Sequence, residues 1–394
     1  MGFLSGSISF RRFYIEGPLA RECDDEMCGK LAAHAFGKHG YETTDGIESG
    51  WVTPAHIFDT DFSSTEKFAM GPFLHLGFRL DRTGAPANVV KAYRLMEEKT
   101  MLEESGREFL SKKERRLAKE AAVRRAELEA RQGNFRRSAA YPVLIDLEHR
   151  QIYLGNNSSA VGDRFMQLLK ETLGISLTPA DSQEVAYRIA ALRGDQRSFE
   201  DAEPSYFVDC PIEEHTTPFD GTDRNFLGWE FLTWLWYVLE VREGQVSISD
   251  QESISVTFAR NLHLSCCFEL SGSDSILNDA PVRSPEAKAA LTIGKTPRRA
   301  GFLIASRAGE WQVNLDGPRF TCSGLVIPAL EEGDALAIAE HRFLQMRLFS
   351  EALDALYGAF LKQRLTPAWG SEFAAMKHWV QSLKSGDVRT RASA

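Results

Sequence analysis

The feature that most constrains this chain is a basic segment over residues 107–137, R-E-F-L-S-K-K-E-R-R-L-A-K-E-A-A-V-R-R-A-E-L-E-A-R-Q-G-N-F-R-R. It holds 11 Lys/Arg against 5 Asp/Glu, a net of +6 in a chain whose formal net charge is -9. A helix with one thin apolar stripe is predicted by the spacing of Leu110, Leu117, Ala121 and Leu128. A row of cations along such a helix suits the regular charge of a nucleic-acid backbone. The alternative is a solvated helix laced with salt bridges.

The distribution of charge along the chain limits the kind of partner that it can bind. Outside residues 107–137 the net charge is -15, so positive charge is segregated. An acidic exterior around one basic surface would restrict where a polyanion docks, and it argues against polyanion binding over the whole surface. At 394 residues, 43% of them hydrophobic, the chain is long enough for two or three globular domains.

Cysteine usage and the absence of long apolar runs indicate the compartment. The six cysteines form no C-x-x-C pair, and their spread over a long chain predicts reduced thiols in a cytoplasmic protein. The first residues, M-G-F-L-S-G-S-I-S-F-R-R, lack the apolar core and cleavage site of a signal peptide. The longest apolar run, near residues 231–239, is too short to cross a bilayer, so we predict no membrane partner.

The pattern along the chain predicts an α+β fold with mixed, mostly antiparallel sheets and one long charged helical segment. We expect an N-terminal α+β domain over residues 1–192, which includes the basic helical segment 86–137. Residues 193–224 are polar and rich in Asp, Glu and Pro, so they predict an inter-domain linker. A C-terminal α+β domain is expected over 225–394, ending in helices at 334–361 and 367–384. An N-terminal helix is expected over 19–36.

Residues 226–241, F-L-G-W-E-F-L-T-W-L-W-Y-V-L-E-V, place large apolar side chains at helical spacing. This predicts a core helix that runs into a strand. The alternative is that Trp229, Trp234 and Trp236 stack on nucleic-acid bases.

The sequence contains none of the common catalytic motifs: no phosphate-binding loop, no G-x-G-x-x-G, no H-E-x-x-H and no G-x-S-x-G. Asp59 and Asp61 could imitate the magnesium site of a nuclease, although an isolated D-x-D in a Ser/Thr-rich loop is typical of a turn. His34 and His39 lie near Cys28 without an obvious completing ligand. We therefore predict no catalytic residue, no metal and no cofactor.

Several short motifs occur in a fixed order. They are G-W-V-T-P at 50–54, V-V-K at 89–91, L-E-E at 102–104, K-K-E at 112–114, L-A-K-E at 117–120, F-R-R at 135–137 and I-D at 145–146. In this order and spacing, residues 45–180 resemble the recombination-associated protein family RdgC. The run L-G-W-E-F-L-T-W-L-W at 227–236 looks like a segment of longer members of that family, whereas the C-terminal part departs from the short members.

The resemblance implies a homodimer closed into a ring through two separate contacts. Duplex DNA would pass through a central hole with a basic lining and be bound with little sequence preference and without catalysis. Such proteins are thought to limit access of the RecA recombinase to DNA. We accordingly expect a nucleoid-associated cytoplasmic protein whose partner is double-stranded DNA, with single-stranded DNA as an additional candidate.

Ten cations are predicted to contact the DNA, of which the first carries over by its position in the V-V-K motif. The predicted residues are Lys91, Lys112, Lys113, Arg115, Arg116, Lys119, Arg124, Arg125, Arg136 and Arg137. No base-reading element stands out, so low sequence specificity is expected. A smaller basic patch at Lys295, Arg298 and Arg299 is either another contact or a solvated turn.

Two other classes of function stay open. A nuclease or other DNA-processing enzyme would use Asp59, Asp61 and a nearby His. A protein-interaction scaffold would use the basic helix to meet an acidic partner.

Overall fold

The structure is a computed structural model that describes residues 2–38, 46–209, 221–268, 272–330 and 332–383. Its N-terminal half contains β1 (Ile8–Glu16), α1 (Asp25–Ala33), β2 (Ile47–Val52), β3 (Ala69–Met70), β4 (Phe73–Thr83), α2 (Ala87–Ser105), α3 (Lys112–Arg131), β5 (Arg136–Asp146), β6 (Gln151–Leu154), α4 (Ser159–Leu173), β7 (Ser176–Pro179) and α5 (Ser182–Arg193). Its C-terminal half contains α6 (Gln196–Glu200), α7 (Phe226–Arg242), β8 (Gln245–Ser249), β9 (Glu252–Cys266), β10 (Ser273–Leu277), α8 (Pro285–Thr292), β11 (Lys295–Ser306), β12 (Gly309–Asp316), β13 (Thr321–Val326), α9 (Ala335–Arg364) and α10 (Trp369–Ser382).

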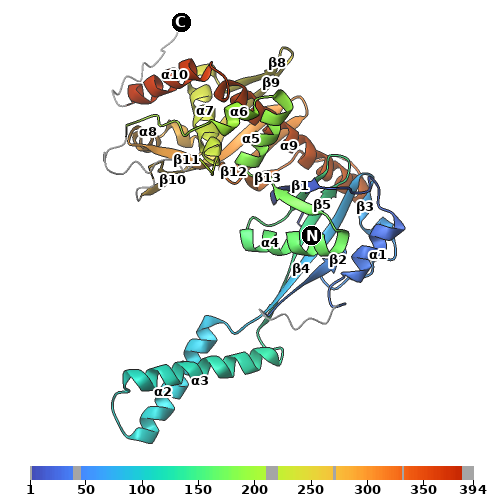
Figure 1. Cartoon of the computed structure of the whole chain (residues 1–394), viewed down its shortest axis with the longest axis vertical. Helices are drawn as coiled ribbons and strands as arrows, with labels where there is room; N and C mark the ends of the chain where they lie inside the picture. The colour runs from blue at the N-terminus through green and yellow to red at the C-terminus, as the bar shows by residue number, and fades with distance from the viewer. Residues whose placement is uncertain (1, 39–45, 210–220, 269–271, 331, 384–394) are drawn as a thin grey trace.

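The predicted α+β class is confirmed, because one large sheet of antiparallel pairings carries helices on its faces. The strand order is β10-β9-β11-β12-β13-β1-β6-β5-β4-β2, with β3, β7 and β8 paired to β4, β1 and β9. β1 belongs to both halves: Ile8 and Phe10 pair with β13, and Arg11 to Tyr14 pair with β6. The chain as a whole forms a crescent, with the C-terminal half at one end and the α2–α3 hairpin at the other (Figure 1).

In the N-terminal half, α1 and α4 cover one face of the sheet. Trp51 and Phe78 from β2 and β4 pack on Phe165 of α4, with ring centroids 6.0 and 5.6 Å apart. The indole N–H of Trp51 donates to Thr172 Oγ1 over 2.8 Å, which satisfies the one polar atom of this buried side chain. α1 begins at Asp25 because the side chain of Asp24 accepts from the N–H of Met27 over 2.8 Å, so this helix is shorter than the predicted 19–36.

In the C-terminal half, α7 is buried all round, as expected of a helix that is apolar on every side. Trp229, Trp234 and Trp236 are 4%, 3% and 0% exposed, which confirms the core-helix prediction and excludes base stacking by these side chains. α9 packs beside α7, where Tyr357 and Phe360 contact Phe231 at centroid separations of 5.0 and 5.8 Å.

Residues 193–224 contain structure of their own where they are described. α6 lies within them, and Phe199, Ala202 and Phe207 are buried against the C-terminal core. Residues 210–220 of the predicted linker lie outside the described residues. Within the described part of the chain, none of the helices has the length and apolar character needed to cross a membrane.

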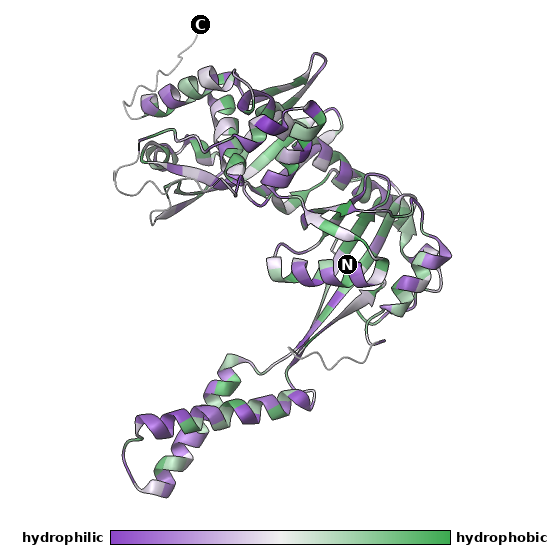
Figure 2. Ribbon diagram, in the orientation of Figure 1, coloured by the Kyte–Doolittle hydropathy of each residue, from purple (hydrophilic) through white to green (hydrophobic). Residues whose placement is uncertain are grey.

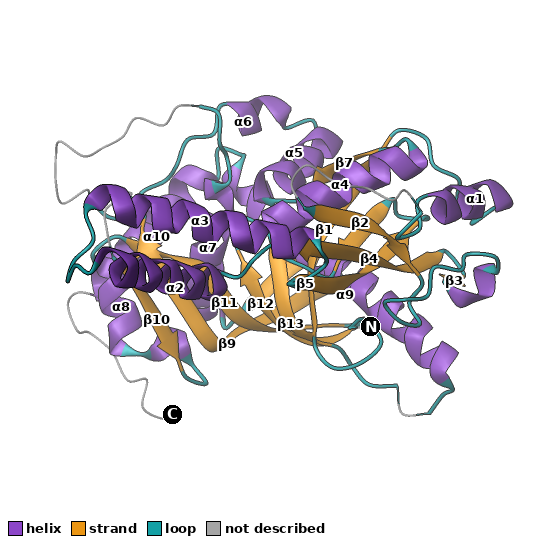
Figure 3. Cartoon of the chain, turned by 90° about the horizontal axis from the view of Figure 1, so that it is seen from below, coloured by secondary structure: helices purple, strands orange, loops and turns teal. Residues whose placement is uncertain are grey.

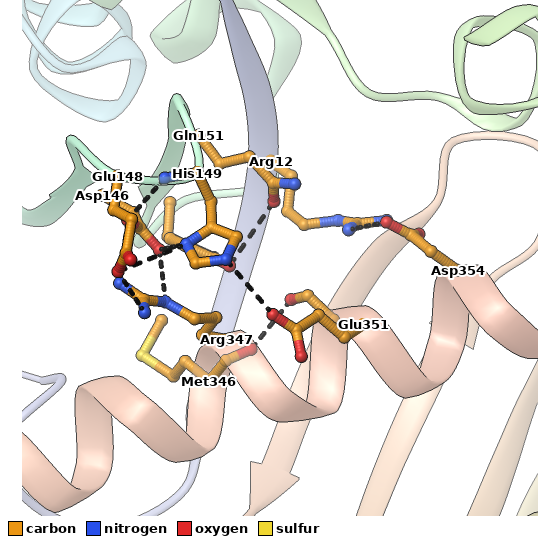
Figure 4. A network of polar contacts seen from close by, with 11 residues as sticks. Arg12, Asp146, Glu148, His149, Gln151, Met346, Arg347, Glu351 and Asp354 are labelled. Carbon is orange, nitrogen blue, oxygen red and sulfur yellow. Dashed lines mark hydrogen bonds and ion pairs between the residues drawn. The ribbon is translucent and has the colours of Figure 1, made fainter. Parts of the chain in front are cut away.

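A network of ion pairs joins α9 to the sheet of the N-terminal half (Figure 4). Arg347 donates to both carboxylate oxygens of buried Asp146, over 2.7 and 2.9 Å. Arg12 of β1, itself 1% exposed, pairs with Asp354 through both terminal nitrogens. On the surface of the network, His149 Nε2 lies 3.7 Å from Glu351. α9 therefore connects the two halves through side chains, in addition to the main-chain connection made by β1.

His75 of β4 is fully buried, and neither ring nitrogen has a hydrogen-bond partner among the described residues. Its ring lies between Phe3 and Phe343, at centroid separations of 6.2 and 5.2 Å. Burial lowers the pKa of His75 to about 4 from its usual 6.5. Well above pH 6.5 the imidazole is neutral in both the folded and the unfolded chain. As the pH falls from 6.5 to 4, the unfolded chain binds the proton and the folded chain does not, so the free energy of unfolding falls.

We expect this histidine to remove about 2 kcal/mol of stability between about pH 7.5 and pH 5. Urea unfolding at a series of pH values measures the effect. The variant His75→Phe should show a flatter pH dependence than the wild type, whereas His56→Phe, at an exposed position, should not. Equal pH dependence in the wild type and His75→Phe would contradict the assignment.

Candidate nucleic-acid interface

The basic segment forms half of a two-helix hairpin that projects from the body of the protein (Figure 1), and its two helices lie side by side in the view from below (Figure 3). We call α2 and α3, residues 87–131, the arm. Its two ends leave the sheet together, since the last residue of β4, Thr83, pairs with the first residue of β5, Arg136. The arm is therefore a continuation of the β4–β5 ribbon.

Local signals explain where the arm helices begin and end. α2 follows Pro86 and stops at Gly106, which takes a left-handed conformation with φ of 60°. α3 begins with a capping box: Ser111 Oγ accepts from the N–H of Glu114 over 3.3 Å, and the Glu114 carboxylate accepts from the N–H of Ser111 over 2.8 Å. These bonds, and the ion pair with Arg107, lower the pKa of Glu114 to about 2.

The seam between the arm helices is built from alanines, which differs from the predicted stripe. Four alanines at four-residue spacing are buried along α3: Ala118, Ala122, Ala126 and Ala130. Of the predicted apolar stripe, Leu117 and Leu128 are 43% and 54% exposed, Ala121 is half-buried and Leu110 is buried just before the helix begins, so this stripe is not the buried face of α3. Small side chains let the two helix backbones approach closely, whereas leucines at the seam would hold them apart. The pattern i, i+4 of alanines is the sequence signal that could have located this seam.

The charge of the arm is carried by α3. α3 has eight Lys/Arg and four Glu, whereas α2 has three Lys/Arg and four Glu. Hydrophilic residues accordingly dominate the surface of α3, with scattered apolar residues between them (Figure 2).

All ten predicted cations are exposed. Seven of them have no ion pair or side-chain hydrogen bond to any other described residue: Lys91, Lys112, Lys113, Arg115, Lys119, Arg124 and Arg137. Arg116 lies 3.5 Å from Glu120, an exposed i,i+4 pair of the kind that contributes little to stability. A shallow hollow of about 390 Å³ on the outer surface of α3 is lined by Arg116, Lys119, Glu120, Val123, Arg124 and Glu127. The structure thus leaves most of these cations available to an anionic ligand.

Two of the predicted cations have structural partners. Arg125 lies over the Tyr93 ring, 4.3 Å from its centroid, and pairs with Glu129 over 3.3 Å. The Tyr93 hydroxyl donates to Glu129 over 2.5 Å, so Arg125, Tyr93 and Glu129 together brace α3 against α2.

Arg136 stabilises the base of the arm. Its guanidinium donates to Asp81 over 2.7 Å and to Glu48 over 2.8 Å. Burial by itself would raise the pKa of Asp81, but hydrogen bonds from Arg79, Ser138 and Arg136 outweigh it and lower the pKa. Arg137, the next residue, is exposed beside Arg82 of β4.

The second basic patch lies in a strand, β11, so of the two alternatives for it the solvated turn does not hold. Lys295 pairs with Asp274 over 2.7 Å and is 18% exposed. Arg298 donates to Ser265 over 3.0 Å and lies over the Trp229 ring. Arg299 lies within the strand, where the β11–β12 pairing begins; it remains 59% exposed and pairs with Asp316.

The aspartates considered for a nuclease are engaged in their own loop. Asp59 accepts from Thr53 Oγ1 over 2.7 Å and from the N–H of Asp61 over 3.0 Å. Asp61 pairs with Lys67 over 2.7 Å. Within the described ranges no three His, Cys, Asp or Glu side chains are grouped closely enough to hold a metal ion. His39, considered with His34, lies outside the described residues.

A scan of the chain against protein-family models finds no match, and a search of curated proteins finds none that is significantly similar. What the protein binds is therefore inferred from the placement and charge of its own residues.

Proposed function

We propose that this protein binds duplex DNA without sequence preference and encloses it as a ring-shaped homodimer. The observation that carries the proposal is the set of exposed, unpaired cations on α3, at one end of the crescent. A phosphate backbone is the ligand that best matches a linear array of Lys and Arg on a rigid helix, because its charges repeat regularly and demand no particular base.

The ring is the part of the proposal that the resemblance to the RdgC family contributes. A curved chain with a basic arm at one end suits a subunit that closes around a duplex with a second copy. Exposed apolar side chains on the arm also favour self-association: Leu95, Met96, Phe109, Leu117 and Leu128 are between 43% and 71% exposed. Bound in this way along the nucleoid, the protein would limit access of the RecA recombinase to DNA.

A nuclease is the weaker alternative. The lone pairs of Asp59 and Asp61 that would coordinate a metal are used by Thr53, Lys67 and the local main chain. A scaffold that binds an acidic protein would use the same cations. A measurement of DNA binding distinguishes the two functions, because the scaffold need not bind DNA.

The test compares retention on closed-circular and linear plasmid of the same sequence. We expect the wild type to sediment as a dimer, twice the 44.1 kDa of one chain. We further expect protein loaded on circles at low salt to stay bound through a high-salt wash, and to be released when the circle is cut once. Equal loss from circles and linear DNA would refute enclosure, and failure to bind either DNA at low salt would refute the proposal.

A further inference from the structure

A polar groove lies on the C-terminal sheet, on the face opposite the one that packs against α7 and α9. It has a volume of about 510 Å³ and is lined by residues of β9 to β13 and by the loop before α4. Strand alternation explains its polarity: Phe258, Phe302 and Trp311 point into the core, while their neighbours point outward. The lining residues used below are Asn157, Asn261, Arg299, Asn314 and Arg319.

Two arginines and one carboxylate give the groove its charge. Arg299 Nε donates to Asp316 over 2.7 Å, and its terminal nitrogens have no partner among the described residues. Arg319 is exposed, and its guanidinium forms no hydrogen bond or ion pair with any described residue. Arg11 lies close to Arg319. Burial lowers the pKa of Arg11; two nearby aspartates act to raise this pKa, and the positive charge of Arg319 acts to lower it. An anion in the groove would meet guanidinium groups whose donors are unused.

Three amide side chains line the groove beside these arginines, together with hydroxyl and aliphatic side chains of the same strands. Asn261 donates to Asn314 over 2.6 Å, and Asn157 Nδ2 donates to the carbonyl of Cys322 over 3.1 Å. The Oδ1 atom of Asn157 is buried without a partner among the described residues, so a donor from bound water or a ligand is needed there. Arginine with Asn and Ser side chains is the combination that proteins use for phosphate and sugar contacts.

The groove lies on the side of the C-terminal half that is nearer the arm. In Figure 1 β10 to β13 lie between the arm and the helices α5, α7 and α10, whereas the β8–β9 end of the sheet extends to the far side. Since the groove is on the face of these strands opposite α7, it lies on the same side of the sheet as the arm.

We propose that this groove is a second contact for the nucleic-acid backbone, so that one duplex is held by the arm and by the C-terminal sheet. This inference rests on the proposed function and extends it to residues far from the basic segment in the sequence. Charge complementarity selects the occupant: a backbone phosphate can accept from the unused donors of Arg299 and Arg319, which both line the groove.

The test measures duplex affinity against salt for Arg299→Ala/Arg319→Ala. Each phosphate contact contributes roughly 0.9 to the log–log salt slope, so we expect the slope to flatten by about 1 to 2 and affinity to fall about tenfold. The matched control, Arg197→Ala/Arg307→Ala, removes two exposed arginines, one of them at the opposite end of the β11–β12 hairpin. Thermal unfolding of each variant checks that the fold is retained.

The outcomes separate this inference from the proposed function. If the groove variant binds DNA like the control while charge reversal on the arm weakens binding, the second contact is refuted and DNA binding by the arm stands. If the wild type does not bind duplex DNA, both fall. Photo-crosslinking provides an independent measurement. Leu277 lines the groove and is 79% exposed, so a photoreactive amino acid in its place should cross-link to bound duplex. Absence of that cross-link, with DNA bound, would also count against the groove.

Discussion

Reversal of three charges at the start of α3 is expected to weaken duplex DNA binding by at least about 100-fold. The variant is Lys112→Glu/Lys113→Glu/Arg116→Glu. Each lost phosphate contact should take roughly 0.9 from the log–log salt slope, so a slope flatter by about 2 to 3 is expected. Fluorescence anisotropy with unrelated duplexes over a range of salt concentrations measures both quantities.

The substitutions should leave the arm folded, because acidic residues in the first turn of a helix are favoured by its dipole. Lys112 and Lys113 are the first two residues of α3, while Arg116→Glu places a like charge four residues before Glu120 and costs only a few tenths of a kcal/mol. The control Arg21→Glu/Arg197→Glu/Arg307→Glu makes the same change in net charge at exposed positions away from the arm. Equal weakening by both variants would show that net charge, rather than the arm, determines binding.

Loss of the buried ion pair between Glu230 and Arg364 is expected to cost about 3 to 5 kcal/mol, a large share of the stability of a typical domain. Glu230 of α7 has no exposed surface and accepts from Arg364 Nε over 2.6 Å. It also accepts from the N–H of Ser205 over 2.6 Å. Arg364→Met keeps most of the side-chain volume but leaves the carboxylate buried without a counter-charge. Urea unfolding measures the loss.

The pH dependence and the double variant test the cause. Burial raises the pKa of Glu230, opposed by the charge and hydrogen bond of Arg364. When folding raises the pKa of a carboxyl group, the stability of the protein falls as the pH rises above the pKa of that group in the unfolded chain. Arg364→Met should therefore destabilise the protein more at neutral than at acidic pH. Glu230→Gln/Arg364→Met should recover much of the loss, because glutamine is neutral and can still accept from Ser205.

An exposed ion pair provides the comparison. Arg197 and Asp201 are 94% and 73% exposed, so Arg197→Met should change stability by less than about 0.5 kcal/mol. A loss for Arg364→Met as small as this would mean that water reaches Glu230 and that the pair is not desolvated.

Local spacing in the sequence predicted the elements whose causes are local. Helix spacing located α7 and α9 to within a few residues, because apolar periodicity acts within one or two turns. The concentration of cations over residues 107–137 likewise identified the segment that became α3. Its charge keeps it in water whatever the rest of the fold does, so its exposure followed from composition alone.

Only the tertiary structure decided which residues meet across long distances in the chain. The buried face of α3 follows from the packing of α2 against it, which buries four alanines that lie outside the predicted apolar stripe. Arg136 is held by Asp81 and Glu48, partners that the β4–β5 pairing and β2 bring to it. The groove depends on β1 joining the two halves, which places Asn157 beside Arg319 although 162 residues separate them in the sequence. Such contacts depend on strand order and helix docking, and no spacing within a single segment encodes them.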